Sequence, residues 1–384
     1  MPSQPSTNRV LIYNASNTST FDSLSDYRSE RLEAMRGISG LERLKKCRAV
    51  PFGRVTLSLV GNRVIQCGLT TCGSVWTCPV CSAKILTHRK YEVDEAISAW
   101  VYQGGYFILE TLTLCHRLGD TVAKQRDALK VGWEAITHGS FSDNHKKAGQ
   151  FGYLKVTEVT YGKNGFHVHF HVLRFMKGDL SKAAQDKWMT KIFNKWQKSI
   201  TSAGFRKPLE SGHHSERVYD SERLKGYFTK GFDNPGTNKS MSKSSPVWDV
   251  LTKAIANPKS THTFIWRTWE SESKGMRQMT WSRNLRQSLG LVKELEDEEI
   301  IEPPIPLLEI EPDDVYLYGH SGRTQSQVKR YLSEGDLSSA IKVLDEMGIR
   351  YRLMVEQHGQ TQEGYPLTAI ASIPSQVSDT LIPA

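Results

Sequence analysis

Two segments near the middle of the chain alternate apolar and polar residues with the period of a β-strand. They are residues 153–161 (YLKVTEVTY) and 166–175 (FHVHFHVLRF), and in such segments successive side chains point to opposite faces of a sheet. The loop GKNG between them, residues 162–165, has the glycines and the asparagine that tight hairpin loops favour. The pattern therefore predicts an antiparallel hairpin.

A third strand and several helices surround this hairpin in the sequence. Residues 106–114 (YFILETLTL) are rich in apolar and β-branched residues, which favours a strand. Helical periodicity is found in KQRDALKVGWEAITHG, in LSKAAQDKWMTKIFNKWQKSI, in SERLKGYFTKG and in a Trp-rich region from Pro246 to Gln287. This order predicts an α+β fold over residues 101–291, with a central antiparallel sheet and helices on one face.

The segment before this domain predicts a small separate module. Residues 1–28 are rich in Ser, Thr and Asn, so we expect a disordered arm. Within residues 29–100 we expect a basic helix ending near Lys46, two short strands joined at Gly61-Asn62, a cysteine cluster, and a helix that begins near Cys78.

The segment after this domain has two parts. Residues 292–316 contain ten acidic residues and one basic residue, together with prolines, which predicts an acidic linker. Residues 317–384 predict a small helical C-terminal module, because GRTQSQVKRYLSEGDLSSAIKVLDEMG has the pattern of two helices.

The charge of the chain favours a polyanionic partner. The net charge is +9, and the 49 basic and 31 acidic residues outside the acidic linker give +18. Neutralising phosphates releases condensed counterions, so such a chain favours nucleic acid, although ribosome-binding and membrane-surface proteins have a similar charge. The sequence has neither a membrane-spanning apolar run nor a signal peptide, so we expect a cytoplasmic protein with no membrane partner.

Three histidines in the second hairpin strand predict a metal site. His167, His169 and His171 project from one face of the strand, with adjacent pairs about 7 Å apart. The hairpin loop places Glu158 opposite His169 and on the same face. Two imidazoles and one carboxylate, with open positions, suit Mg²⁺ or Mn²⁺ that engages a substrate phosphate as a Lewis acid.

Other interpretations fit the same residues. The histidines could form a polar sheet face that hydrogen-bonds to its neighbours, and Glu158 could be a cross-strand partner for a lysine or a histidine. A slip of one residue in the loop would also move Glu158 to the other face.

The cysteines predict a structural zinc site. Cys72, Cys78 and Cys81 have the spacing Cys-x5-Cys-x2-Cys, and zinc takes four nitrogen or sulfur ligands in a tetrahedron. Spacing favours Cys67 as the fourth ligand, and His88 is another choice. In a chain with no export signal the alternative is a group of buried, reduced cysteines rather than disulfides.

Three motifs resemble those of the HUH (His-hydrophobic-His) endonuclease superfamily, in particular the rolling-circle replication initiators of bacterial plasmids. They are FILETLTL at residues 107–114, HVHFHVL at 167–173 and LKGYFTKG at 224–231, in that order. The resemblance spans roughly residues 47–286. It is strongest to the initiators of actinobacterial plasmids, which have runs similar to GLTTCGSVWTCPVC and MTWSRNLR.

This resemblance implies a fold, a location and two sets of ligands. The α+β domain is expected to be HUH nuclease-like, and the protein is expected in the bacterial cytoplasm. His169 and His171 would hold the divalent metal, with His167 as a neighbour. Cys47, just before the predicted strand pair, would be the fourth zinc ligand.

The third motif contains the nucleophile that the resemblance implies. Ser221 can cap a helix that places Tyr227 and Lys230 on one side. Attack of the phenol on a phosphodiester would give a 5′-phosphotyrosyl link and a free 3′-hydroxyl, while Lys230 holds the phosphate.

Two points about this motif stay open. Some relatives have a glutamate four residues before the tyrosine that activates water and ends the reaction. That position is Arg223 here, so Glu222 is the candidate base. Without the resemblance, Tyr227 would be interpreted as a core residue of an amphipathic helix.

Together these features predict an enzyme that initiates rolling-circle replication of a plasmid, or of a phage, by nicking one strand at the origin. The expected partners are origin DNA in single-stranded or hairpin form, and the host helicase and replication machinery. A relaxase or a transposase would use the same chemistry. A noncatalytic zinc-dependent DNA-binding regulator, with structural histidines, is the alternative from a different class.

Overall fold

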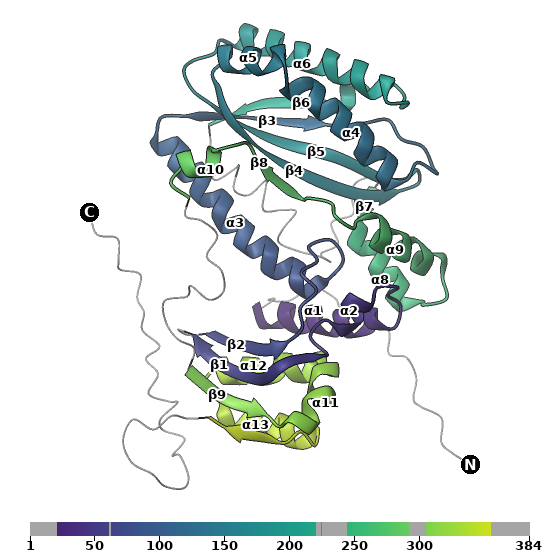
Figure 1. Cartoon of the computed structure of the whole chain (residues 1–384), viewed down its shortest axis with the longest axis vertical. Helices are drawn as coiled ribbons and strands as arrows, with labels where there is room; N and C mark the ends of the chain where they lie inside the picture. Colours follow the sequence, from purple (N-terminus) through teal and green to yellow (C-terminus); the bar gives the residue numbers. More distant parts are fainter. Residues whose placement is uncertain (1–20, 61–62, 220–223, 225–243, 292–304, 355–384) are drawn as a thin grey trace. The chain divides into compact units, whose positions relative to one another are not determined.

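The computed structural model describes residues 21–60, 63–219, 224, 244–291 and 305–354 of the chain, which divides into two compact units (Figure 1). The described residues of the larger unit fall within Ser74–Thr77 and Ser82–Glu294. Those of the smaller unit fall within Tyr13–Gly73, Cys78–Cys81 and Leu295–Ala384.

The larger unit is built on a six-stranded antiparallel sheet. Its strand order is β6-β3-β5-β4-β7, and β8 pairs with β4 beside β7. The strands are β3 (Tyr106–Leu112), β4 (Gln150–Gly162), β5 (Gly165–Met176), β6 (His214–Val218), β7 (Ser244–Pro246) and β8 (Met279–Trp281). The prediction of an α+β fold with an antiparallel sheet and a central hairpin, β4 and β5, is thus confirmed, whereas β8 is a strand in a region expected to be helical.

The helices of this unit lie on both faces of the sheet. They are α3 (Pro79–Tyr102), α4 (Val122–Thr137), α5 (Ser140–Lys147), α6 (Lys182–Ser202), α8 (Val247–Ala256), α9 (Thr261–Glu272) and α10 (Leu285–Ser288), and a 3-10 turn is at Glu210–Gly212. Figure 1 shows α4, α5 and α6 on one side of the sheet and α3 on the other. The expectation of helices on one face only was therefore wrong.

The two faces of β5 differ in what covers them. The even-numbered residues face α4 and α6. The ring of Phe170, for example, lies 6.2 Å from that of Trp196 on α6. On the other face, Leu173 and Phe175 belong to an apolar core with Trp100 and other residues of α3. The histidines are on this second face, at the end of the strand away from Leu173 and Phe175. The odd-numbered residues of β5 are therefore apolar where they pack against α3 and are histidines beyond that core.

A buried ion pair lies on the face of the sheet that α6 covers, where Arg174 also lies over the ring of Trp188. Arg174 donates from Nε and Nη2 to Oε2 of Glu110, at 3.0 and 2.5 Å, and both side chains are fully buried. His213 lies 3.1 Å from the other carboxylate oxygen. These charge-assisted hydrogen bonds keep the pKa of Glu110 below its usual value, although burial alone would raise it.

The smaller unit joins segments from both ends of the described chain. Its four-stranded antiparallel sheet has the order β10-β9-β1-β2. The elements are α1 (Phe21–Arg36), α2 (Glu42–Lys46), β1 (Pro51–Val60), β2 (Arg63–Leu69), β9 (Ile305–Ile310), a 3-10 turn at Pro312–Asp314, α11 (Val315–His320), α12 (Gly322–Ser333), α13 (Leu337–Glu346) and β10 (Tyr351–Leu353).

Two parts of this unit differ from the sequence-based expectation. Residues 305–316 were expected in an acidic linker, but they contain β9, which pairs with β1 and buries Leu308 and Ile310 in a shared core. Helix α1 begins at Phe21, inside the segment expected to be disordered, and packs against α12, where Ser29 and Ser326 are hydrogen-bonded. Both differences depend on contacts between segments about 250 to 300 residues apart in sequence, which local patterns do not reveal.

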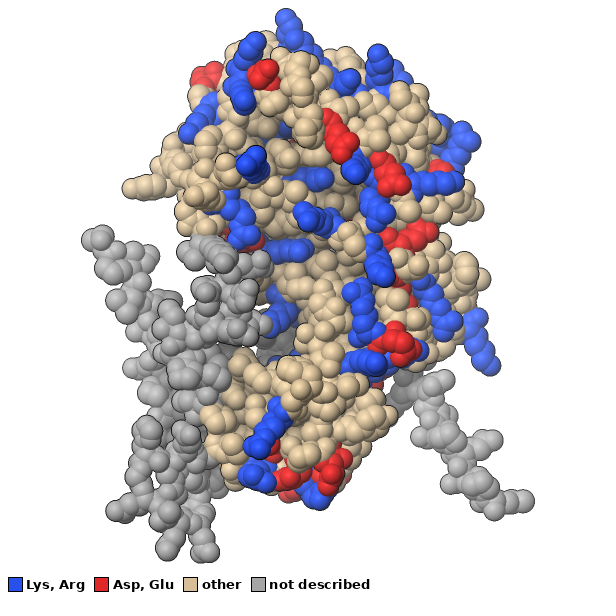
Figure 2. Space-filling view, viewed as in Figure 1, with Lys and Arg blue, Asp and Glu red and all other residues tan. Residues whose placement is uncertain are grey.

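The larger unit is basic, and none of the described helices could span a membrane. Residues 82–291 contain 33 basic and 19 acidic residues, a net charge of +14, and Lys and Arg predominate on the visible face of the larger unit (Figure 2). No helix in the described part of the chain combines the length and apolarity needed to cross a membrane.

Candidate functional site

The β4–β5 hairpin brings a carboxylate and two imidazoles together. Glu158 is the cross-strand partner of His169, as the sequence predicts. Its Oε2 atom lies 2.7 Å from Nε2 of His171 and 3.2 Å from Nε2 of His169, and the two Nε2 atoms are 3.1 Å apart. The three potential ligand atoms therefore converge on one point.

These distances fit a divalent cation with octahedral geometry. Ligands 2.0–2.1 Å from Mg²⁺ lie about 3 Å apart when they occupy adjacent positions. The three observed separations, from 2.7 to 3.2 Å, are of this size. The donors come from one side only, which leaves the remaining positions for water or a substrate oxygen. Among the predicted ligands, the structure thus brings Glu158, His169 and His171 into one group.

Hydrogen bonds also favour the ionised form of Glu158, which is the form that binds a cation. Partial desolvation would raise the pKa of Glu158, but the hydrogen bonds and charges of His169 and His171 lower it well below its usual value. The side chain is about half exposed. Glu158 is therefore an ionised, accessible ligand at neutral pH.

His167 lies beside this group and not in it. Its ring stacks between those of His169 and His116, with centroid distances of 5.0 and 4.8 Å. Burial, together with the nearby imidazoles, lowers the pKa of His167 to about 3, so the ring is neutral. This arrangement agrees with the interpretation of His167 as a neighbour of the ligands.

Sequence reasoning missed two residues at this site. His116, in the loop after β3, extends the stack of imidazoles, and Thr111 on β3 contacts the second ring nitrogen of His171. Neither residue is distinguished in the sequence by its type or by its spacing from the predicted ligands. Only the pairing of β3 with β5 could have indicated Thr111.

The predicted nucleophile, the predicted phosphate-binding lysine and the candidate base lie outside the described residues. These residues are Tyr227, Lys230 and Glu222. Leu224, the first residue of the third motif, is described, is buried, and belongs to the same apolar core as Leu173 and Leu109. That core lies on the same sheet face as the histidines, next to their end of β5.

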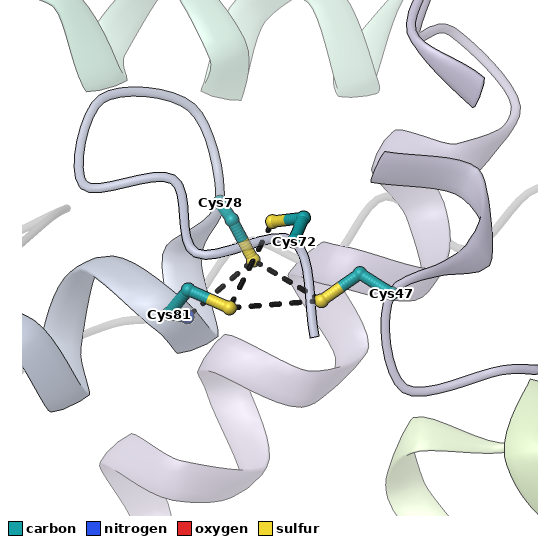
Figure 3. Close-up of side chains that lie close together, drawn as sticks. All are labelled: Cys47, Cys72, Cys78 and Cys81. Carbon is teal, nitrogen blue, oxygen red and sulfur yellow. Dashed lines mark hydrogen bonds between the residues drawn. The ribbon is translucent and has the colours of Figure 1, made fainter. Parts of the chain in front are cut away.

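A second group of side chains that could hold a metal ion lies in the smaller unit. Figure 3 shows the sulfur atoms of Cys47, Cys72, Cys78 and Cys81 directed toward one centre, with Cys78 and Cys81 at the start of α3. Three of the S···S separations are 3.7, 3.7 and 3.8 Å. A tetrahedron with Zn–S bonds of 2.3 Å has edges of about 3.8 Å, so the group has the dimensions of a closed zinc site with four cysteine ligands.

The fourth cysteine of this group is Cys47, as the resemblance implies. Cys67, which spacing favoured, lies in β2 with its side chain exposed and is not in the group, and neither is His88. Cys47 follows α2, more than twenty residues before Cys72, so spacing along the chain could not identify it. Hydrogen bonds among the four cysteines lower the pKa of Cys47 and Cys81 and raise the pKa of Cys72 and Cys78, because two of the thiols donate to the other two sulfur atoms.

Arg36 connects this cysteine group to the C-terminal helices of the smaller unit. Its Nη2 donates to the carbonyl oxygens of Cys47 at 2.9 Å and Gly319 at 3.3 Å, and its Nη1 donates to that of His320 at 3.4 Å. A side chain at Gly319 would collide with Ala49, because a Cβ there would lie 2.3 Å from the Ala49 carbonyl oxygen. Arg36 and the close approach of Gly319 to Ala49 thus hold α11 against the segment that contains Cys47.

Comparison with known proteins gives two similar chains, both from Streptomyces. The chain is 25% identical to a protein named "Protein rep" from Streptomyces lividans, over 62% of its own length and 67% of that protein. It is 29% identical to a protein named "Neomycin resistance protein" from Streptomyces cyanogenus, over 39% of its own length and 40% of that protein. The chain is thus similar to an actinobacterial Rep protein, and it spans less than half of the second relative. No protein-family model and no solved structure matches it.

Proposed function

We propose that the chain initiates rolling-circle replication of an actinobacterial plasmid by nicking one strand of the origin. The convergence of Glu158, His169 and His171 within 3.2 Å carries this proposal, because such a group suits a divalent metal that engages a phosphate. The name of the Streptomyces lividans relative, "Protein rep", supports a role in replication.

In the proposed reaction, the oxygen of Tyr227 attacks the phosphorus of one phosphodiester. The phenol gives up its proton as a P–O bond forms to the tyrosine oxygen and the bond to the 3′-oxygen breaks. The 3′-oxygen takes a proton and becomes the free 3′-hydroxyl primer. Mg²⁺ or Mn²⁺ held by Glu158, His169 and His171 would supply Lewis-acid stabilisation of the phosphoryl charge. Lys230 would help to hold the same phosphate, and Glu222 is the candidate base that ends the cycle.

Chain connectivity supports the assignment of Tyr227. It follows Leu224 by three residues, which at full extension span at most about 11 Å. Leu224 is in the apolar core on the histidine-bearing face, together with Leu173, which is two residues after His171. Leu224, three residues before Tyr227, thus packs on the same sheet face as the proposed metal ligands, and this supports the assignment.

The remaining parts of the proposal concern DNA and zinc. The substrate is origin DNA in single-stranded or hairpin form, which a net charge of +14 on residues 82–291 favours. After nicking, the host helicase and replication machinery would together extend the free 3′-hydroxyl. Nicking is assigned to residues 101–291, and zinc at Cys47, Cys72, Cys78 and Cys81 has a structural role.

The test is a nicking assay on a supercoiled plasmid that carries the DNA flanking the gene of this protein. With Mn²⁺, the protein is expected to relax the plasmid and stay covalently attached, and Tyr227→Phe and His169→Ala are each expected to abolish both. Tyr219→Phe is the control, since Tyr219 is an exposed tyrosine before the third motif. Nicking by a protein that carries both Tyr227→Phe and His169→Ala would contradict the proposal.

The same assay distinguishes the alternatives. A zinc-dependent regulator would bind duplex DNA without any metal-dependent cleavage. A relaxase or a transposase would nick DNA from a transfer origin or a transposon end rather than the replication origin.

A further inference from the structure

We infer that Thr111 is a positioning residue that fixes the ring orientation and the tautomer of His171 for metal binding. The inference rests on the proposed function, because it concerns the metal site of the proposed nicking reaction. Thr111 would contact neither the metal nor DNA, and would act only through His171.

The contact arises from strand pairing. Thr111 on β3 is the cross-strand partner of His171 on β5, within seven consecutive pairs that run without a bulge from Tyr106 and Met176 to Leu112 and Phe170. Directly opposed side chains on one sheet face have Cβ atoms about 5 Å apart, so a short hydroxyl can reach the neighbouring ring. The Oγ1 atom of Thr111 is 3.2 Å from Nδ1 of His171.

The chemistry of imidazole gives this contact a consequence. A neutral ring has one protonated nitrogen and one nitrogen with a free lone pair. Nε2 of His171 faces Glu158 and His169, so it must have the lone pair if His171 is to bind a metal there. The proton is then on Nδ1, which donates a hydrogen bond to Oγ1 of Thr111. In the other tautomer, the proton on Nε2 would point at the metal position and block it.

The two histidines of the site differ in this respect. Nδ1 of His169 is buried and has no hydrogen-bond partner among the described residues. Its ring is instead held by stacking on His167, with centroids 5.0 Å apart. The support from the Thr111 hydroxyl is therefore specific to His171, and loss of that hydroxyl would remove the acceptor for a protonated Nδ1 of this ligand.

A purely structural role for Thr111 makes a different prediction. Threonine is common in strands because its branched side chain packs well on a sheet, and valine provides the same branching without the hydroxyl. If packing were its function, Thr111→Val would be silent and Thr111→Ser would be the harmful change. If the hydroxyl matters, the order is reversed.

The experiment measures Mn²⁺ affinity by titration calorimetry on the full-length, zinc-loaded protein without DNA. The wild type is expected to bind Mn²⁺ at a site that His169→Ala abolishes. Thr111→Val is expected to weaken this binding about 10- to 100-fold, the usual effect of losing an outer partner of a metal-bound histidine. Thr111→Ser is expected to restore most of it. Thr113→Val is the matched control, because the Thr113 hydroxyl is bonded to the Gly212 carbonyl and not to a ligand.

The outcomes separate this inference from the proposed function. If the wild type binds no Mn²⁺ that depends on His169, the proposed metal site fails, and the inference fails with it. If the wild type binds Mn²⁺ and Thr111→Val binds it equally well, the inference is overturned while the proposed function stands.

A second measurement does not depend on the folding of any variant. Long-range ¹H–¹⁵N spectra of the histidine side chains report which ring nitrogen carries the proton. In the Mg²⁺-loaded wild type, Nδ1 of His171 is expected to be protonated. A spectrum in which Nδ1 lacks the proton would overturn the inference.

Discussion

Oε2 of Glu158 lies 2.7 Å from Nε2 of His171, although the two residues are thirteen positions apart on different strands. The hairpin makes this possible, because Gly162 pairs with Gly165 and the pairing continues without a bulge to Glu158 and His169. The side chain of Glu158 then reaches both imidazoles. A local turn therefore determines the geometry of the candidate metal site.

The first prediction concerns the contribution of the Glu158 charge to metal binding. Glu158→Gln keeps the size of the side chain but removes the negative charge, so Mn²⁺ affinity is expected to fall at least about tenfold. Titration calorimetry measures this affinity. Glu216→Gln is the control, because Glu216 is on edge strand β6 and is not in the ligand group. Equal Mn²⁺ affinity in Glu158→Gln and the wild type would remove Glu158 from the site.

The cysteine group is expected to hold one zinc ion per chain. Cys47→Ala is expected to lose most of the zinc, since a closed site needs all four ligands, whereas Cys67→Ala is expected to keep it. Metal analysis by mass spectrometry measures the content. Loss of zinc from Cys67→Ala and its retention in Cys47→Ala would show that the assignment of the fourth ligand is wrong.

Removal of zinc is expected to unfold the smaller unit in particular. All nine tryptophans are in the larger unit, so circular dichroism reports on both units while tryptophan emission reports on the larger one. A strong chelator is expected to reduce the helical signal with little change in emission. An unchanged helical signal in the zinc-free protein would mean that the site does not stabilise the fold.

Helix α6 offers a test of DNA binding. Lys187, Lys191, Lys195 and Lys198 are on α6, on the side of the sheet opposite to α3, and none of them forms an ion pair within the described part of the chain. Replacing all four by glutamine is expected to reduce the slope of log K against log salt for duplex DNA by up to about 3.6. Mn²⁺ affinity is expected to stay the same.

The control for this helix is Lys182→Gln. The Lys182 ammonium is paired with Asp186 at 3.1 Å, so its loss is expected to change the slope less than the loss of an unpaired lysine. An unchanged slope in the fourfold variant would show that this surface does not contact DNA.

His145 is expected to make the larger unit sensitive to acid. Burial lowers the pKa of His145 to about 4 from an ordinary value of 6.5, and its Nε2 donates to the Ile136 carbonyl. Protonation therefore favours the unfolded chain. The contribution to stability is complete above about pH 6.5 and is lost as the pH falls toward 4, and the loss amounts to about 2 kcal/mol at pH 5.

The measurement is thermal unfolding at pH 7 and pH 5, followed by tryptophan emission. His145→Phe is expected to lose less stability between these two values than the wild type does. The same loss in both proteins would show that other groups cause the acid sensitivity.

The sequence predicted the features that depend on short segments. The GKNG loop and the alternation of HVHFHV gave the hairpin, its register and the shared face of Glu158 and His169. The spacing of Cys72, Cys78 and Cys81 gave three of the four cysteines that the structure brings together. In each case, local backbone geometry determines the arrangement, so the pattern is sufficient.

Features that depend on distant pairing could not be predicted in this way. The register of β3 with β5 places Thr111 beside His171, and about sixty residues separate the two. Strand β9 lies within a segment of acidic composition, and only its pairing with β1 shows that Leu308 and Ile310 are core residues. Cys47 was implied by resemblance and not by spacing. The roles of Tyr227, Lys230 and Glu222 stay predictions, since these residues lie outside the described part of the chain.

The most direct test of the proposed reaction is mass spectrometry of the covalent product. The protein is incubated with Mn²⁺ and a single-stranded oligonucleotide that spans the nick site, digested with a protease and a nuclease, and searched for a peptide that carries a 5′-linked nucleotide. The account predicts that the nucleotide is on Tyr227. A nucleotide on another residue, or cleavage with no covalent product, would contradict it.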